Sequence, residues 1–334
     1  MEDSPAIVDA DRGYALIPEQ ASLYAREVDQ LYYVLMGGSA LLVLLLLGLI
    51  IVFGTRYRAS KGGPRRQPVA SKVGHRIEIG FAIVLASLFL GIFGWAAQLY
   101  LDLYDEDARG MVINVIGKQW MWKVQHPDGT REINTLHAPV GEQITLRLTS
   151  QDVIHSFSVP ALRLKRDVVP GMYTTARFEA TETGEFRLFC AEFCGNAHSR
   201  MRGRVVLMSR PDYQDWLERN GAARSPAVAG RQLFQSYGCS GCHYRGGAAR
   251  APSLDGLYGR VVPLAGGGTV EADAAYIRDS ILRPQKHIVA GFEPIMPSFE
   301  GQISEDDIFQ IIAYIRSLKP GDWMQDRPGE GIND

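Results

Sequence analysis

Two long stretches without a charged side chain constrain the fold of this chain more than any other feature. They cover residues 30–55 and 79–101 and are rich in leucine and isoleucine. A helix of roughly 20 apolar residues crosses a bilayer core of about 30 Å, and both stretches exceed that length. Buried core helices are the alternative, but the length of uncharged sequence disfavours them. We therefore predict two transmembrane helices, at about residues 31–54 and 78–101.

The charges beside the two stretches predict their orientation. Residues 1–30 carry seven acidic and two basic side chains, and four acids follow the second stretch. The connector has no acid and carries seven bases, namely Arg56, Arg58, Lys61, Arg65, Arg66, Lys72 and Arg76. Because basic loops tend to stay in the cytoplasm, we expect the connector inside and both termini outside. The first residues do not resemble a signal peptide, and a presequence removed before residue 1 stays open.

The residues after the second stretch divide by pattern into a β region and a helical region. Short apolar or alternating runs separated by turn residues indicate a β-sandwich or barrel, and they lie at residues 111–116, 144–148 and 204–208. Helical spacing follows at residues 229–237, 272–282 and 304–318, the last with a possible capping box at Ser304. We therefore predict five parts. They are an N-terminal segment with the membrane hairpin (1–107), a β domain (108–210), a linker with a short helix (211–227), a helical domain (228–320) and a polar tail (321–334).

The cysteine pair in the helical region lies in a haem-attachment sequence, Cys-Ser-Gly-Cys-His. Cys239 and Cys242 would add to the haem vinyl groups, and His243 would ligate the iron. A thioredoxin-like redox pair lacks its βαβ context here, and a local disulfide is the other alternative. Met296 lies between prolines and is the candidate for the sixth iron ligand, because methionine opposite histidine raises the haem potential. Core filling is the alternative role for this methionine.

The other cysteine pair, at the end of the β region, belongs to a loop of soft metal-binding groups. Cys190, Cys194, His198 and Met201 fall within twelve residues. Thiolate, thioether and imidazole groups together favour copper, and two cysteines suggest two copper ions that share bridging sulfurs. Zinc is the rival ion, since thiolate and imidazole ligands suit it as well. An ion without redox chemistry would leave the neighbouring haem without a purpose, so we favour copper over zinc. A disulfide between Cys190 and Cys194 is the remaining alternative and is less favoured still.

Residues 229–319 resemble a small class I cytochrome c, with a haem helix, a connecting loop, a methionine loop and a terminal helix. Pro252 resembles the proline of that family whose carbonyl accepts a hydrogen bond from the haem-ligating histidine. Tyr258, Arg260 and Tyr314 are candidates for the haem pocket, with ordinary packing as the alternative.

Residues 1–210 resemble subunit II of the haem-copper cytochrome c oxidases, and the fused cytochrome matches a bacterial variant of that subunit. The resemblance implies a multidomain chain with a transmembrane hairpin, a cupredoxin-like β-sandwich and an all-α cytochrome c domain. It implies a dinuclear copper centre held by the imidazoles of His155 and His198, the bridging thiolates of Cys190 and Cys194, the thioether of Met201 and the backbone carbonyl of Glu192. The Glu192 side chain is then expected to help bind magnesium at the interface with subunit I.

Two further residues take roles from the resemblance. Trp120 corresponds to the residue through which electrons enter from cytochrome c, although Met121 stands where the family usually has another aromatic residue. Trp120 and Trp122 would face the same side of a strand, so a packed sheet face is the alternative. Glu78 corresponds to the glutamate at the entrance of a proton path, and an interfacial, solvated carboxylate is its alternative.

The resemblance implies the electron-input subunit of a bacterial terminal oxidase. Electrons would pass from a donor through haem c to the dinuclear copper and on to a haem in subunit I, where oxygen is reduced and protons are translocated. The donor is expected to be cytochrome c or a quinol–cytochrome c reductase complex. The other expected partners are subunit I, subunit III and the lipid of the inner (plasma) membrane, with both redox domains on the periplasmic side. The 35 basic and 37 acidic residues give no nucleic-acid footprint.

Two other functions stay open at this point. One is the electron-transfer subunit of a copper-containing nitric oxide reductase, and the other is a stand-alone membrane-tethered electron carrier. Glu192 and Glu78 favour the oxidase, because both would serve an interface with subunit I. A quinol-oxidising relative is disfavoured, since such subunits lack these cysteines.

The charge distribution predicts how the two redox regions meet. Residues 228–320 carry nine bases and nine acids, and residues 102–220 carry fifteen bases and sixteen acids. Neither region has the opposed net charge that steers free partners together. We expect the covalent linker to replace charge attraction, since a short tether gives an effective concentration of roughly millimolar order.

Overall fold

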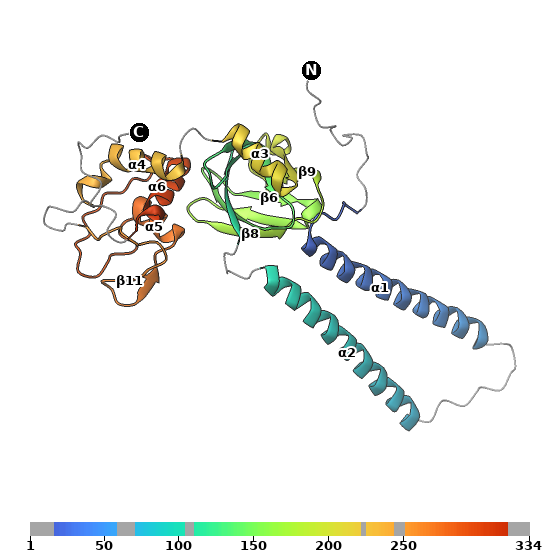
Figure 1. Cartoon of the computed structure of the whole chain (residues 1–334). Helices are drawn as coiled ribbons and strands as arrows, with labels where there is room; N and C mark the ends of the chain where they lie inside the picture. Colours follow the sequence, from blue (N-terminus) through green and yellow to red (C-terminus); the bar gives the residue numbers. More distant parts are fainter. Residues whose placement is uncertain (1–16, 59–70, 104–109, 222–224, 244–250, 320–334) are drawn as a thin grey trace, which may run out of the picture. The chain divides into compact units, whose positions relative to one another are not determined.

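The computed structural model describes residues 17–58, 71–103, 110–221, 225–243 and 251–319 (Figure 1). They belong to two compact units, of which one is Gln20–Asp107 and the other contains Ala108–Asp334. Most of the predicted basic connector, part of the predicted linker and the predicted polar tail lie outside the described residues.

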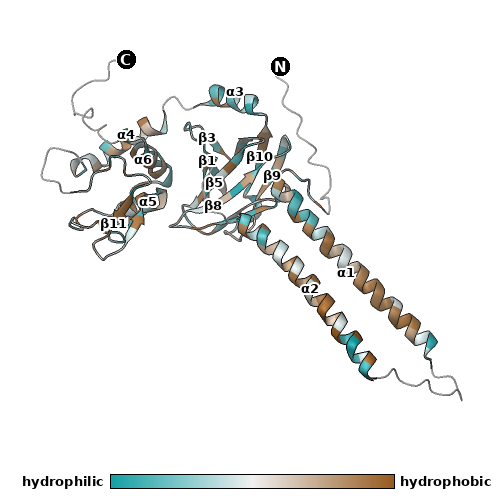
Figure 2. Ribbon diagram, turned by 60° about the horizontal axis from the view of Figure 1, so that its bottom comes forward, coloured by the Kyte–Doolittle hydropathy of each residue, from teal (hydrophilic) through white to brown (hydrophobic). Residues whose placement is uncertain are grey.

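The first unit consists of two long apolar helices, α1 (Leu23–Arg56) and α2 (Ser71–Leu103). The hydroxyl of Ser22 caps α1 by accepting a hydrogen bond from the Ala25 N–H at 3.0 Å. Figure 2 shows the hydrophobic residues along both helices. The most apolar stretch of each helix has no residue buried within the protein. At 1.5 Å per residue, α1 is about 51 Å long, longer than a bilayer core. Both helices therefore have the length and composition to cross a membrane, as predicted.

The β region is a sandwich of two mixed five-stranded sheets. The first sheet has the order β3 (Arg131–Ile133), β2 (Met121–Gln125), β1 (Met111–Lys118), β5 (Gln143–Ser150) and β8 (Thr174–Glu179). The second has the order β4 (Thr135–Pro139), β10 (Arg202–Met208), β9 (Gly184–Cys190), β6 (His155–Val159) and β7 (Leu164–Val168). The predicted strands are confirmed as β1, β5 and β10.

Alternation along the strands fills the space between the sheets. Leu146 and Leu148 of β5 are fully buried, and Leu188 of β9 and Val205 of β10 are buried on the other sheet. Successive side chains of a strand point to opposite faces, so each strand gives one face to this core. Two sheets packed face to face in this way form the predicted cupredoxin-like sandwich.

A polar cluster anchors α3 (Arg210–Asn220) to the edge of the sandwich. The Glu132 carboxylate accepts hydrogen bonds from His126 Nε2 at 2.8 Å and from His137 Nδ1 at 2.6 Å. The Tyr213 hydroxyl of α3 lies 2.8 Å from His126 Nδ1, and Trp216 of α3 stacks on the His137 ring with centroids 4.3 Å apart. Both aromatic and hydrogen-bonded contacts thereby hold α3 against the sandwich.

The C-terminal region is mostly helical, as predicted. Its elements are α4 (Pro226–Ser236), the 3₁₀ turn η3 (Cys239–Gly241), β11 (Val261–Pro263), β12 (Thr269–Glu271), α5 (Ala274–Leu282) and α6 (Glu305–Ser317). A β-carbon on Gly230 would lie 1.9 Å from the Gln310 carbonyl oxygen, so only glycine lets α4 cross α6 this closely. Ser304 caps α6 by accepting from the Asp307 N–H at 3.2 Å, which places the start of that helix as predicted. The β11–β12 hairpin is an addition that the sequence patterns did not indicate.

Candidate functional site

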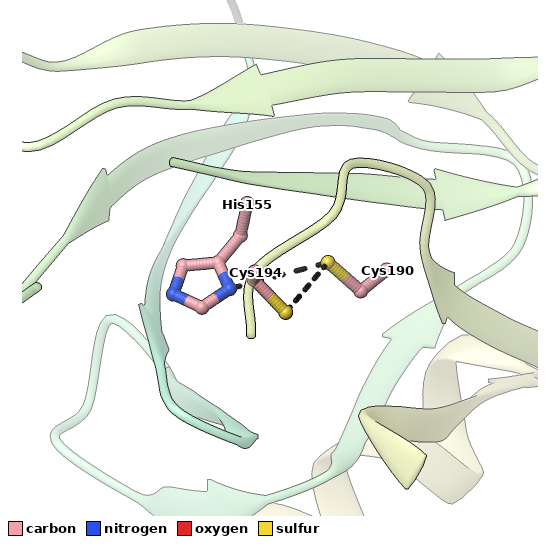
Figure 3. A group of neighbouring side chains, drawn as sticks. All are labelled: His155, Cys190 and Cys194. Atoms are coloured by element: carbon pink, nitrogen blue, oxygen red, sulfur yellow. Dashed lines mark hydrogen bonds between the residues drawn. The ribbon is translucent and has the colours of Figure 1, made fainter. Parts of the chain in front are cut away.

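The predicted copper ligands converge at one end of the sandwich. Cys190 ends β9, the following loop carries Cys194 and His198, and Met201 immediately precedes β10. His155 is the first residue of β6 in the same sheet. The side chains of His155, Cys190 and Cys194 point toward one another (Figure 3), and all three residues are buried.

The two cysteine sulfurs form the centre of this group, 3.7 Å apart. The Cys190 sulfur lies 4.0 Å from His155 Nδ1 and 3.2 Å from the Glu192 carbonyl oxygen. The Cys194 sulfur lies 3.5 Å from His198 Nδ1 and 3.8 Å from the Met201 sulfur. Each sulfur thus has one imidazole beside it, and the six groups named from the sequence are brought together.

The thiols have opposite electrostatic environments. Burial raises the pKa of Cys190, but hydrogen bonds from His155 and from the backbone lower it to about 6. Burial, together with the neighbouring Cys190 sulfur, raises the pKa of Cys194. A pair of sulfurs this close resists carrying two negative charges, and a bound cation removes that penalty because metal coordination deprotonates thiols. The donor set therefore fits soft metal ions.

Asp152 supports the site and was not predicted from the sequence. Its Oδ1 lies 2.8 Å from His155 Nε2, so the imidazole presents Nδ1 to the cysteines. Its Oδ2 accepts a hydrogen bond from the Gln119 N–H at 2.7 Å. A carboxylate on the outer nitrogen fixes the ring orientation of a metal-ligating histidine. The signal in the sequence was its position three residues before His155.

Gly117 also supports the site, because its backbone packs closely against the His155 ring. A β-carbon there would lie 2.8 Å from Cδ2 of His155. Trp122 packs edge-on against the same ring with centroids 6.0 Å apart. The imidazole is therefore enclosed on sides other than the one that faces the cysteines.

Trp120 is not on a packed sheet face, so that alternative is wrong. It lies in the two-residue turn between β1 and β2, where 37% of its surface is exposed, whereas Trp122 is fully buried. The Trp120 indole N–H donates to the Cys194 carbonyl at 3.2 Å, and the Gln119 side chain donates to the same oxygen at 2.9 Å. An exposed aromatic ring thus contacts the backbone of the cysteine loop directly.

The haem-attachment sequence lines an apolar cavity of about 470 Å³. Cys239, Cys242, His243 and Met296 all lie on its wall, together with Pro252. The Pro252 carbonyl lies 3.0 Å from His243 Nδ1, so Nε2 is the nitrogen left for iron. Burial lowers the pKa of His243, which keeps the imidazole in the neutral form that binds a metal. The cavity and its donors fit a covalently attached haem.

The other haem-pocket candidates separate into two groups. Arg260 lines the cavity. Tyr258 and Tyr314 are not among the residues that line it. Tyr314 packs against Phe234, and Tyr258 lies beneath the Arg316 guanidinium. For these two tyrosines the structure supports ordinary packing.

The two glutamates with predicted roles are both exposed. The Glu192 carbonyl faces the Cys190 sulfur while its side chain is in solvent. Glu78 lies near the start of α2, 3.7 Å from His75 on the same helix face. Among the residues that the structure describes, neither carboxylate belongs to a group of three or more possible metal ligands.

Two family models match this chain. That of cytochrome c oxidase subunit II, periplasmic domain, matches residues 130–208, and that of cytochrome c oxidase, cbb3-type, subunit III, matches residues 225–315.

Several curated proteins are similar to the chain. Cytochrome c oxidase subunit 2 of Alkalihalophilus pseudofirmus is 36% identical over 217 residues, which cover 62% of this chain and 61% of that protein. Its counterpart in Thermostichus vulcanus is 42% identical, over 36% of this chain and 37% of that protein. Cytochrome c oxidase subunit 2 of Lachancea kluyveri is 30% identical, over 46% of this chain and 72% of that protein. The chain thus spans less than two thirds of the first two proteins and more than two thirds of the third.

Proposed function

Because the chain belongs to the cytochrome c oxidase subunit II family, we propose that it is the electron-input subunit of a terminal oxidase. Electrons would pass from a donor through haem c and a dinuclear copper centre to a haem in subunit I, where oxygen is reduced. The observation that carries this proposal is the meeting of two buried thiols with two imidazoles and a thioether, in a chain that also encloses a haem-attachment cavity.

In this proposal the ligands divide evenly between two copper ions. His155 would bind one ion and His198 the other, with both cysteine sulfurs bridging, because each imidazole lies beside a different sulfur. Met201 would add a weak thioether contact and Glu192 its carbonyl oxygen. When bound, the copper pair and the haem supply one-electron carriers. Asp152 and Gly117 would keep the His155 ring in place during the change of charge.

The haem would be held by the residues that line the cavity. Cys239 and Cys242 would form the thioether bonds, and His243 and Met296 would be the iron ligands. Pro252 would hold His243 in the tautomer that presents Nε2.

The wider assembly follows from the same proposal. The two apolar helices would anchor the chain in the bacterial inner membrane, with both redox regions on the periplasmic side. The exposed Glu192 carboxylate would bind magnesium at the interface with subunit I, and Glu78 would stand at the mouth of a proton path. Subunit III is a further proposed partner, and cytochrome c or a quinol–cytochrome c reductase complex is the proposed donor. Trp120 is the proposed entry residue of a second route, by which an external cytochrome c would reduce the copper centre directly, since the Trp120 ring is exposed and contacts the cysteine loop.

The test is electron paramagnetic resonance of the full chain purified in detergent with copper. We expect a seven-line copper spectrum, which arises from one unpaired electron shared by two copper nuclei, together with a c-type haem absorption band. Cys190→Ser should abolish the seven-line spectrum and keep the haem band, and Cys239→Ser is the matched control with the reverse result. A chain that binds only zinc, or a Cys190→Ser variant with an unchanged copper spectrum, would refute the bridging assignment. Purification without a large membrane subunit would instead support a stand-alone carrier.

A further inference from the structure

The copper domain and the cytochrome region meet through an aromatic stack. Tyr173, which follows the Pro170–Gly171 turn, stacks on Phe309 of α6 with ring centroids 5.4 Å apart and planes at 19°. Phe309 is only 3% exposed. The two residues are 136 positions apart in the chain, within the unit that contains Ala108–Asp334. A nearly parallel stack of two large rings is a specific contact. Two domains joined only by a flexible linker would not need such a contact.

Cationic groups from both regions complete the contact around Tyr173. The Arg147 guanidinium of the copper domain lies 5.8 Å from the ring centroid, and that of Arg278 from the cytochrome region lies 5.5 Å from it. Arg278 is itself held by Glu305, through a hydrogen bond from Nε to Oε1 at 3.0 Å. Both members of this pair are buried, so the cytochrome side of the contact is rigidly organised.

Two polar contacts accompany the stack. Lys123 Nζ lies 2.8 Å from Asp306 Oδ2, and both side chains are mostly buried. Arg283 of the cytochrome region donates to the Gly171 carbonyl at 2.8 Å. One ion pair and one hydrogen bond at fixed positions define the orientation of the two surfaces, which an aromatic stack alone would leave free to slide.

This surface lies next to the segment that supports His155. The Gln151 side chain lies 3.5 Å from Asp306 Oδ2 and precedes Asp152, the residue that orients His155. Trp120 keeps its exposed surface and is turned to the Cys194 carbonyl instead. The cytochrome region therefore reaches the copper domain from the Gln151 side.

We propose that Tyr173, Phe309 and the Lys123–Asp306 pair form a fixed docking interface that holds the cytochrome region on the copper domain in one orientation. The interface uses shape and stacking, which explains why the two regions need no opposed net charge. It deepens the proposed function and rests on it, because it joins the region that would carry the haem to the domain that would carry the copper. Trp120 is then left for a second, external electron-carrying protein.

Zero-length cross-linking of the full chain in detergent tests the interface. A carbodiimide joins a contacting ammonium and carboxylate as an amide, with loss of one water, and peptide mass spectrometry locates the bond. We expect Lys123–Asp306 to be the main link between the two regions, at low and at high ionic strength. Asp306→Asn should abolish it, and Asp307→Asn is the matched control that should keep it. Comparable yields from Lys123 to many carboxylates would overturn the proposal.

Substitutions of Tyr173 test whether the stack holds the orientation. Tyr173→Ala should lower the yield of the Lys123–Asp306 link several-fold, whereas Tyr173→Phe should keep it, because the tyrosine hydroxyl has no partner among the described residues. Retained circular dichroism and haem absorption would show that the alanine variant is folded. A wild-type yield from Tyr173→Ala, or an equal loss from Tyr173→Phe, would contradict the proposal. The link reports geometry alone, so it can fail while the copper spectrum that tests the proposed function stands.

Discussion

Glu132→Gln should weaken the copper domain in a manner that depends on pH. The Glu132 carboxylate is 8% exposed and accepts hydrogen bonds from His126 and His137. Burial raises its pKa, but the two imidazoles lower it from 4.5 to about 2. A carboxylate whose folded pKa is depressed stabilises the fold above its unfolded pKa and loses that contribution as pH falls through the folded value.

The magnitude follows from the two pKa values. A difference of about 2.5 corresponds to about 3 kcal/mol at pH 7, at about 1.4 kcal/mol per pKa unit. The same relation leaves about 1.4 kcal/mol at pH 3 and almost nothing below pH 2. The free energy of unfolding of Glu132→Gln should therefore lie about 3 kcal/mol below wild type at pH 7, and the two should converge in acid.

Urea unfolding followed by near-ultraviolet circular dichroism measures this difference. The chain without copper should be used, so that loss of metal in acid does not contribute. Glu182→Gln is the matched control, because Glu182 is an exposed carboxylate in the same domain. A difference between Glu132→Gln and wild type that stays constant from pH 7 to pH 3 would refute the reasoning, since the effect would then not come from ionisation.

Two further predictions concern the cytochrome region and its link to copper. Gly230→Ala should lower the melting temperature of the cytochrome region, because the new β-carbon would meet the Gln310 carbonyl and overpacking costs about 1–3 kcal/mol. Gly266→Ala, with open space around it, is the control, and equal melting of both variants would count against the close crossing. Flash-induced electron transfer from haem to copper should be nearly independent of ionic strength, and a many-fold slowing with added salt would contradict a fixed interface.

The parts that the sequence predicted well depend on local order. The ligand sequence from Cys190 to Met201 is a single loop, so its spacing alone keeps the donors near one another. The cap at Ser304 and the alternation in β5 are likewise set by neighbours in the chain. These features are predictable because few arrangements of a short segment satisfy them.

The parts that the sequence did not predict depend on strand pairing. Gly117 reaches His155 because β1 pairs with β5 in parallel, with Gly117 opposite Ser150. Period-two alternation does not say which strands are neighbours, so this contact had no signal. The alternative that placed Trp120 on a packed sheet face is wrong for a related reason. It extended the alternation through a two-residue turn that reverses the chain after Lys118.

The length of the linker limits how far the cytochrome region can move from the copper domain. Helix α3 ends at Asn220 and α4 begins at Pro226, which leaves five residues, 221–225, between two anchored helices. Five extended residues reach at most about 18 Å. If α3 left the sandwich as an intact helix, its 11 residues would add about 17 Å, and the tether could reach about 35 Å. The Glu132 cluster therefore limits how far the cytochrome region can move, and the Tyr173 stack selects one position within that range. Loss of the cluster alone should leave docking intact, because the stack and the Lys123–Asp306 pair do not depend on α3.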